Sequence, residues 1–263
     1  MKRSALFTII LLTFAFSAFA QRFPLIYQIK QVSQLPAEIP QRVQALAFDG
    51  KKLWFALYHD KGRYATFNPR TKEWKYSDSE IQHQSISRIA RPRAGVGGMV
   101  FVNKRLWVSS AYGASFGYIN TSDWQVGQIF SPKVRPDLKD TQSYADMTYD
   151  GKYIWIAWHL GNYQLPDSEV QQLLKVETEN GEILEKYPLP IGSRQDSTHG
   201  LTFDGEILWH IKGRNLSAID LKGRLLGQFK LMELRRPSGI VWDGKSLWIV
   251  EFDGKLWNLP VKR

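Results

Sequence analysis

The chain repeats one pattern of apolar and polar positions five times. A typical copy starts with a small residue, replaced by Asp146 in one copy, and a short apolar run. It continues through Asp-Gly and two further residues, and it ends on Leu-Trp or Ile-Trp before another apolar stretch. Four copies agree closely and start at Ala45, Asp146, Gly200 and Gly239. A fifth, looser copy starts at Gly98, and there Asn-Lys takes the place of Asp-Gly.

Each copy predicts a β-hairpin. Runs of β-branched and aromatic residues on both sides of Asp-Gly are typical of two strands, and Asp-Gly favours a tight type I′ turn between them. Further apolar segments follow each tryptophan, as at residues 217–220 and 223–229, and these predict a third and a fourth strand. Each unit is therefore expected to be a four-stranded antiparallel meander.

The spacing of the repeats indicates how the meanders are assembled. The copies recur at intervals of roughly 50 residues, which is typical of propeller blades rather than of helical repeats; the markers are Trp54, Trp107, Trp155, Trp209 and Trp248. We therefore predict an all-β fold, a five-bladed β-propeller of four-stranded antiparallel blades. A β-sandwich built from similar hairpins is the structural alternative.

The two ends of the chain predict how the ring closes. The last copy stops after its third strand, at residues 255–260, and residues 25–32 resemble the missing fourth strand. A blade shared by both termini would remove the exposed sheet edges that an open ring would leave. Residues 21–263 are therefore expected to form a single five-bladed β-propeller domain.

The first twenty residues predict a signal peptide. Lys2 and Arg3 precede an apolar run at residues 5–16, and small residues follow up to Ala20. This order is typical of a secretory leader cleaved after Ala20, and the apolar run is shorter than the roughly 20 residues that cross a bilayer. We expect an exported protein, periplasmic or secreted, with no transmembrane segment; a membrane anchor is the alternative.

Composition excludes several kinds of chemistry. The 263 residues include no cysteine, which excludes a disulfide scaffold, a thiolate metal site and a cysteine nucleophile. The formal net charge is +10, and two of these charges, on Lys2 and Arg3, belong to the predicted leader. The basic excess therefore belongs to the folded part, where nucleic acid is not the expected partner of an exported protein.

Many of the basic residues lie in the segments that enter the first strand of each blade. These segments meet at one face of a propeller, opposite the Asp-Gly turns, so we expect a positive rim at the mouth of the central channel; the residues are Arg42, Arg88, Arg91, Arg93, Lys133, Arg135, Lys139, Arg194, Arg235 and Arg236. The rim suits an anionic small molecule, an acidic glycan or an acidic envelope protein. The alternative is a soluble basic protein with no such ligand.

The same face collects the candidate site residues. Positions that vary around the constant repeat mix aromatic, cationic, anionic and imidazole side chains, as a site for a small polar ligand does. The candidates for ligand binding are Tyr58, Arg93, Tyr112, Asp146, Trp158, His159, Lys212 and Glu251. His199 and His210 are candidates for acid–base catalysis. No metal-ligand spacing or cofactor motif is present, and ordinary solvated loop residues are the alternative interpretation.

One block of sequence resembles a known family. Thr-His-Gly-Leu-Thr-Phe-Asp-Gly at residues 198–205, followed by Leu208-Trp209-His210 and by residues 216–223, is similar to the repeat of the plant-type glutaminyl cyclotransferases. That family implies a five-bladed propeller with its active site at the channel mouth. The family has glutamine and an acidic residue where this chain has His199 and His210. NHL-type and virginiamycin B lyase propellers have a similar repeat, the latter with more blades.

These observations favour one function and leave an alternative. We expect an exported, monomeric propeller that binds an anionic ligand or partner at its basic mouth without catalysis. The alternative is a lyase or a glutaminyl cyclotransferase-like enzyme that uses the histidines at the mouth. A scaffold that docks another envelope protein through an insertion at residues 160–170 is a further possibility.

Overall fold

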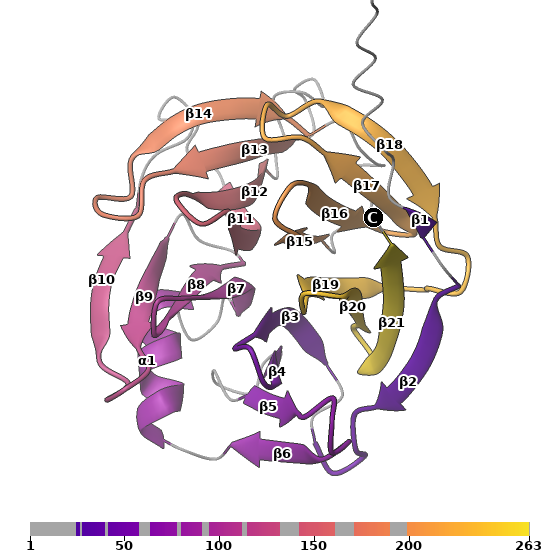
Figure 1. Cartoon of the computed structure of the whole chain (residues 1–263). Helices are drawn as coiled ribbons and strands as arrows, with labels where there is room; N and C mark the ends of the chain where they lie inside the picture. Colours follow the sequence, from indigo (N-terminus) through magenta and orange to yellow (C-terminus); the bar gives the residue numbers. More distant parts are fainter. Residues whose placement is uncertain are drawn as a thin grey trace, which may run out of the picture.

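The structure is a computed structural model that describes residues 25–26, 28–39, 42–57, 64–77, 80–90, 95–111, 115–131, 142–160, 171–189 and 199–262. Five antiparallel sheets stand around a central axis, and the first strand of each lies nearest that axis (Figure 1). The predicted five-bladed β-propeller is confirmed. The predicted leader, residues 1–20, lies outside the described residues.

The blades follow one another along the chain. Blade 1 holds β3 (Val43–Phe48), β4 (Leu53–Leu57), β5 (Tyr64–Phe67) and β6 (Trp74–Ser77). Blade 2 holds β7 (Val96–Val102), β8 (Arg105–Ser110), β9 (Phe116–Asn120) and β10 (Val126–Phe130). Blade 3 holds β11 (Gln142–Tyr149), β12 (Ile154–Leu160), β13 (Gln171–Val176) and β14 (Ile183–Pro188). Blade 4 holds β15 (His199–Phe203), β16 (Leu208–Lys212), β17 (Asn215–Ile219) and β18 (Leu225–Lys230).

Blade 5 closes the ring with strands from both ends of the chain. It holds β19 (Pro237–Trp242), β20 (Ser246–Glu251) and β21 (Lys255–Lys262), and β21 pairs with two N-terminal strands. β2 (Lys30–Gln34) pairs with the first half of β21, and β1 (Leu25–Ile26) pairs with its last two residues. The closure predicted from the sequence is confirmed, although the N-terminal strand forms two pieces instead of one.

The aspartate of the Asp-Gly turn holds the repeat tryptophan in place through hydrogen bonds, and we call this arrangement the clamp. In blade 4, Asp204 Oδ1 accepts hydrogen bonds from the N–H groups of Glu206 and Ile207, and Oδ2 accepts one from Trp209 Nε1 at 2.7 Å. The same arrangement occurs in blades 1, 3 and 5. Each tryptophan is therefore held by a carboxylate five residues earlier in the chain.

The backbone of these turns differs from the expected type I′ geometry. Only the glycine has a positive φ, as at Gly205 (103°), and the aspartate side chain accepts the N–H three residues on. A type I′ turn needs positive φ at both central residues. The aspartate side chain thus takes over the bond that a backbone carbonyl makes in a simple hairpin.

The looser copy in blade 2 forms the type I′ turn that the other copies do not form. Asn103 and Lys104 have φ values of 47° and 63°, which is the type I′ pattern. Counting back from Trp107 places Val102, not Asn103, at the position of the clamping aspartate. Trp107 Nε1 is buried and has no hydrogen-bond partner in the described part of the chain.

One helix interrupts the all-β pattern and was missed by the sequence reasoning. α1 (Glu80–Ala90) connects β6 to β7 and packs against blade 2 through Ile86 and Ile89. Its last carbonyl groups are bound by two buried serine hydroxyls of blade 2, Ser110 to Ala90 at 3.0 Å and Ser115 to Ile89 at 3.1 Å. These bonds satisfy part of the helix end that would otherwise lack partners.

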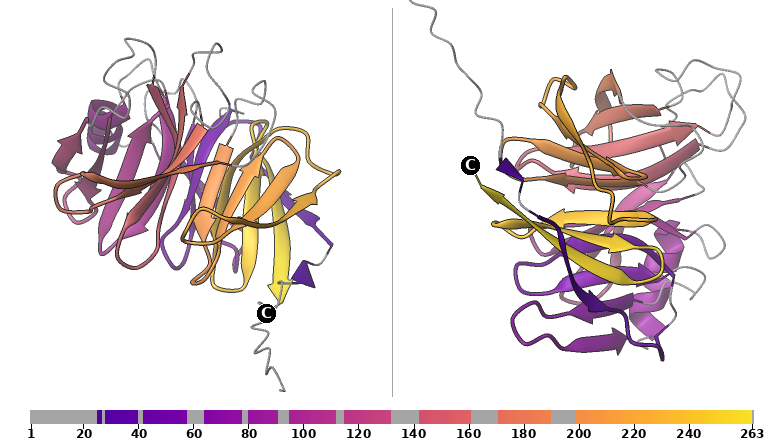
Figure 2. Two further views of the ribbon diagram at one scale, coloured as in Figure 1. Left: turned by 90° about the horizontal axis from the view of Figure 1, so that it is seen from above. Right: turned by 90° about the vertical axis from the view of Figure 1, so that its right-hand side faces the viewer.

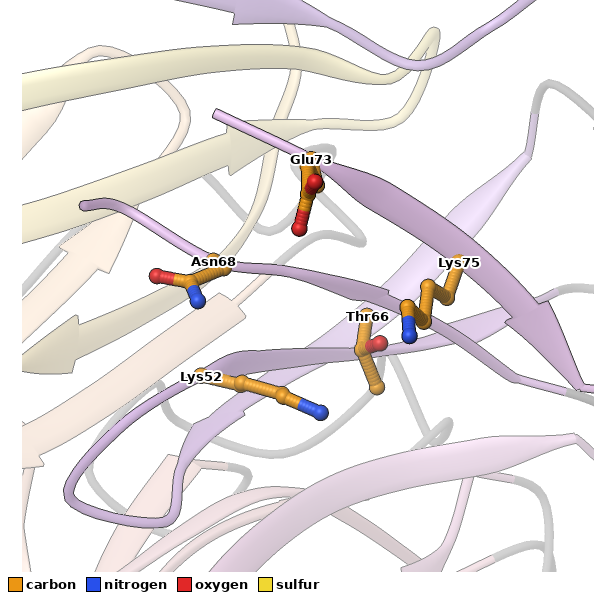
Figure 3. Close-up of a pocket in the computed structure, with 5 residues that line it drawn as sticks. All are labelled: Lys52, Thr66, Asn68, Glu73 and Lys75. Atoms are coloured by element: carbon orange, nitrogen blue, oxygen red, sulfur yellow. The ribbon is translucent and has the colours of Figure 1, made fainter. Parts of the chain in front are cut away.

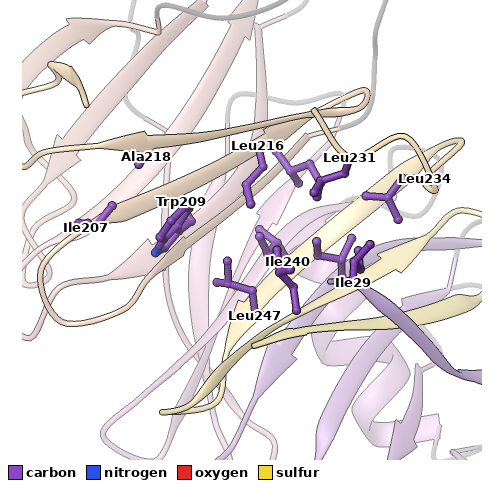
Figure 4. Packing of buried hydrophobic residues seen from close by; sticks show 12 residues of the cluster. Ile29, Ile207, Trp209, Leu216, Ala218, Leu231, Leu234, Ile240 and Leu247 are labelled. Carbon is purple, nitrogen blue, oxygen red and sulfur yellow. The ribbon is translucent and has the colours of Figure 1, made fainter. Parts of the chain in front are cut away.

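Apolar clusters fill the seams between blades. Alternate residues of a strand face opposite blades, so Trp209 and Ile211 pack toward Ile240, Leu247 and Ile249 of blade 5 (Figure 4). The cluster is continuous from β16 to β21. The repeat tryptophan therefore fills the space between its own blade and the next one, as large side chains do at the outer part of such a wedge.

Near the axis the blades approach too closely for side chains. A Cβ on Gly98 would lie 2.5 Å from the Asp146 Cα, and one on Gly239 would lie 2.9 Å from the Leu46 backbone nitrogen. This explains the small residue that opens four of the five copies. Hydroxyl side chains bridge the same gap farther along, since Thr202 Oγ1 accepts the Trp242 N–H at 3.0 Å.

Candidate functional site

The candidate site lies at the mouth face, the face where first strands begin and second strands end. The Asp-Gly hairpins lie at the opposite face, which we call the turn face (Figure 2). Within the mouth face, the seam between blades 3 and 4 holds four polar residues that the sequence singled out, namely Asp146, His159, His210 and Lys212. His159 and Gln171 reach it from blade 3, and His210 and Lys212 reach it from blade 4.

Strand alternation explains why side chains of both blades share this seam. In β12, Trp155 and Ala157 belong to the cluster with blade 4, so His159 has the same orientation. In β16, Leu208 belongs to that cluster, which gives His210 and Lys212 the orientation toward blade 3. Side chains from a strand of blade 3 and a strand of blade 4 therefore meet in one seam, although no local sequence motif marks them.

Lys212 is the centre of this group. Its side chain is fully buried, and Nζ donates a hydrogen bond of 2.7 Å to Oε1 of Gln171, which is also buried. A buried ammonium group loses its hydration and needs such polar contacts in compensation. The pair links the last residue of β16 to the first residue of β13, and thus ties blade 4 to blade 3 at the mouth.

The two histidines are held in the neutral form. Burial, together with the positive charge of Lys212, lowers the pKa of His210 to about 3 and that of His159 to about 4. Desolvation is the larger cause for both groups, because the charged imidazolium loses more hydration than the neutral ring. His210 is fully buried, whereas His159 is partly exposed. Only the smaller part of each shift comes from the positive charge of Lys212.

Asp146 lies in the same seam, nearer the axis. Its Oδ1 accepts the N–H of Met147 at 2.7 Å, and its Oδ2 accepts the N–H of Leu201 in blade 4 at 2.7 Å. Burial raises the pKa of this carboxyl group well above its ordinary value, against the effect of the two backbone bonds. Asp146 thus replaces the small residue of the other copies with a polar link between first strands.

Two further candidates lie in other seams. Trp158 faces blade 2 and is buried in a cluster with Phe116 and Met147. Glu251 is buried in blade 5, where its carboxylate accepts the N–H groups of Arg235 and Arg236 and the indole N–H of Trp257. Both residues lie at the mouth end of a second strand, as expected, but they do not join the group around Lys212.

The structure describes the remaining candidate residues only in part. Tyr58, Arg93 and Tyr112 lie outside the described residues. The backbone of His199 is in β15 and pairs with Lys212, but its side chain lies outside the described part. Gln171 was missed by the sequence reasoning. The strand that it begins, Gln-Gln-Leu-Leu-Lys-Val, has further polar residues in Gln172 and Lys175, so no signal in the sequence singles Gln171 out.

The described part of the positive rim consists of exposed arginines. Arg42, Arg235 and Arg236 of the predicted rim lie at the mouth end of blades 1 and 5, and Arg214, which was not part of that prediction, lies at the mouth end of blade 4. The Arg236 guanidinium lies 4.1 Å from the centre of the Phe252 ring, and the Phe252 backbone bonds to both Arg236 and Val43. These contacts hold the entries of β19 and β3 side by side. Of the other predicted rim residues, Arg88 is described, exposed in the last turn of α1.

Metal chemistry and membrane insertion gain no support from the described residues. No group of three or more histidine, aspartate or glutamate side chains is arranged there to hold a metal ion. The one described helix is too short and too polar to cross a membrane.

Comparison with known proteins supports the fold. No protein-family model and no curated protein matches the chain. Virginiamycin B lyase from Staphylococcus aureus is similar in structure, with 13% identity, coverage of 89% of this chain and 99% of that chain, and a TM-score of 0.53. A catalytically inactive variant of that lyase with quinupristin gives the same identity and coverage and a TM-score of 0.51. BamB from Moraxella catarrhalis has 12% identity, coverage of 87% and 63%, and a TM-score of 0.45.

At 13% identity the two lyase structures show a shared propeller architecture and nothing of activity. The resemblance to the glutaminyl cyclotransferases beyond the fold stays a prediction.

Proposed function

We propose that this protein is an exported β-propeller, periplasmic or secreted, that binds an anionic small molecule at its mouth face. The observation that supports this most strongly is the fixed charge of Lys212, which is buried beneath a face that carries exposed arginines. A buried charge is screened less by solvent and salt than an exposed one, so it acts on the mouth over a longer range. The same charge adds to burial, which is the larger cause, in lowering the pKa values of His159 and His210.

The acids at the mouth only partly offset this field. Glu251 is engaged with backbone and indole N–H groups, and Asp253 pairs with Lys255 at 2.7 Å. Glu233 is exposed beside the arginines, but Arg214, Arg235 and Arg236 outnumber it. An anion that approaches the rim would therefore meet the guanidinium groups of Arg235 and Arg236, which bind carboxylate and phosphate oxygens in pairs.

A calorimetric titration tests this proposal. The chain from residue 21 onward is titrated with inorganic phosphate, acetate and glucuronate at low and at physiological salt. The double variant Arg235→Gln/Arg236→Gln is expected to lose about tenfold in affinity for the bound anion, and the wild-type affinity is expected to fall with salt. The matched control is Lys152→Gln/Lys222→Gln, which removes two exposed charges from the turn face. Equal affinities of the two double variants would overturn the proposal.

An enzyme that uses His199 and His210 as acid and base receives less support. His210 is fully buried and its pKa is lowered to about 3, so at neutral pH it holds no proton to donate and is a weak base. If a turnover assay on a substrate panel detected activity that Lys212→Met preserved and His210→Gln abolished, the enzyme would become the better explanation.

A further inference from the structure

Charged side chains are unevenly distributed over the turn face. Exposed or half-buried cations crowd the turn ends of blades 5, 1 and 2, which are neighbours in the ring (Figure 1). They are Lys245, Lys262, Lys51, Lys52, Arg70, Lys72, Lys75, Lys104 and Arg105. We call this group the basic arc.

The acids within the basic arc are fewer, and most are occupied. Asp49 and Asp243 bind their own turns and tryptophans as clamps. Asp123 accepts the N–H of Gln125 at 2.9 Å. The basic arc therefore keeps an excess of positive charge.

Blades 3 and 4 carry the opposite excess on the same face. Asp150 and Asp204 are clamps here too, and Asp220 pairs with Arg224. The acids that remain at these turns still outnumber the remaining cations, Lys152 and Lys222; they are Glu177, Glu179, Glu182 and Glu206. The turn face is thus divided into a basic and an acidic part. Such a division orients an approaching charged partner, because its attraction to one half comes with repulsion from the other.

A pocket of about 210 Å³ opens within the basic arc. Lys52, Thr66, Asn68, Glu73 and Lys75 line it, and the ammonium ends of Lys52 and Lys75 point toward Thr66 (Figure 3). Thr66 is buried, which gives the pocket a fixed floor on β5. Two cations that converge on one hydroxyl group form a site for a carboxylate.

We propose that the basic arc docks an acidic polypeptide segment, and that one carboxylate of this partner enters the pocket between Lys52 and Lys75. This proposal does not depend on anion binding at the mouth, which is the opposite face.

The lining of the pocket favours a polypeptide over a purely anionic polymer. Glu73 and Asn68 supply a carboxylate and a carboxamide beside the two lysines. Asn68 Oδ1 already accepts the N–H groups of Arg70 and Thr71, and Glu73 Oε2 accepts the Thr71 hydroxyl group. An amide N–H group of a peptide can therefore donate to the other carboxylate oxygen of Glu73, while its acidic side chains meet the lysines. A sulfated glycan supplies mainly acceptors, so it would place sulfate oxygens against the Glu73 carboxylate.

Fluorescence anisotropy with a labelled octaglutamate peptide tests the proposal. The variant Lys52→Gln/Lys75→Gln is expected to weaken binding about tenfold, and Lys51→Gln/Lys245→Gln about threefold, because only the first pair lines the pocket. The control Lys152→Gln/Lys222→Gln removes the same charge from the acidic part and should change the affinity less than twofold. Circular dichroism and thermal unfolding verify that each variant keeps its fold.

Three results would overturn the proposal. One is an equal loss for all three lysine pairs, which would show that only bulk charge matters. Another is a loss confined to Arg235→Gln/Arg236→Gln, which would place peptide binding at the mouth. The third is a sulfated oligosaccharide that binds more tightly than the peptide and depends on the same lysines. Failure of anion binding at the mouth alone would leave the docking proposal intact.

Discussion

Removal of the aspartate clamp should cost far more in blade 4 than in blade 1. The clamps have the same bonds but different surroundings: Trp209 and Ile207 are buried, whereas the blade 1 bonds are exposed. Asp204→Ala leaves two buried donors without an acceptor, at about 1–3 kcal/mol each, so the free energy of unfolding should fall by about 2–6 kcal/mol. Asp49→Ala exposes donors that water can bind, and its cost should be about 1 kcal/mol.

Urea denaturation followed by tryptophan fluorescence and circular dichroism measures both values. The double variant Asp204→Ala/Trp209→Phe isolates the orphaned indole, because the phenylalanine has no N–H to satisfy. The cost of the double variant should be smaller than the sum of the two single costs. If Asp204→Ala and Asp49→Ala lowered the stability equally, burial would not decide the strength of the clamp, and the reasoning would be refuted.

Three further predictions concern the seams. Trp107→Phe should destabilise the protein less than Trp209→Phe in urea titrations, because the indole N–H of Trp107 has no acceptor to lose whereas that of Trp209 is bound by a carboxylate; equal costs would contradict this. His210 has its pKa lowered to about 3 in the folded state, so the unfolded chain binds a proton below pH 6.5 that the folded chain does not. The neutral side chain therefore contributes fully to stability above pH 6.5. The free energy of unfolding decreases as the pH falls toward 3, and the decrease is about 2 kcal/mol at pH 5. His210→Gln should flatten this part of the pH profile of unfolding. Gly98→Ala should lower the melting temperature, since its Cβ would lie 2.5 Å from the Asp146 Cα; an unchanged melting temperature would show that blades 2 and 3 can separate there.

Repeats in the sequence account for most of the fold. The five tryptophans recur in one strand of each blade, and each is placed by a turn only a few residues away, so local chemistry determines the hairpin. Ring closure was also predictable, because the last repeat lacks one strand and the N-terminal segment supplies it. The helix α1 could not be recognised in this way, because it belongs to no repeat and its apolar side chains are buried only by packing against blade 2.

The grouping of the candidate site residues, in contrast, could not be predicted from the sequence. The sequence identified His159, His210 and Lys212 as unusual for their repeat positions, but spacing along the chain gave no sign that they share one seam. Only the tertiary structure decides this, because the alternation of each strand sends Trp158 toward blade 2 and His159 toward blade 4. Gln171 acquires its role through the Lys212 ammonium group of another blade, 41 residues farther along the chain.

The amino-acid sequence by itself determined the blades and their number, since each hairpin depends on contacts between near neighbours in the chain. It also indicated the closure, although that pairing joins the two ends of the chain, because the last repeat lacks a strand that the N-terminal segment resembles. The tertiary structure alone decided which polar side chains meet, how deeply they are buried and where charge accumulates on each face. The physical reason is that burial and electrostatic potential arise from groups brought together by the ring, and no single repeat contains them.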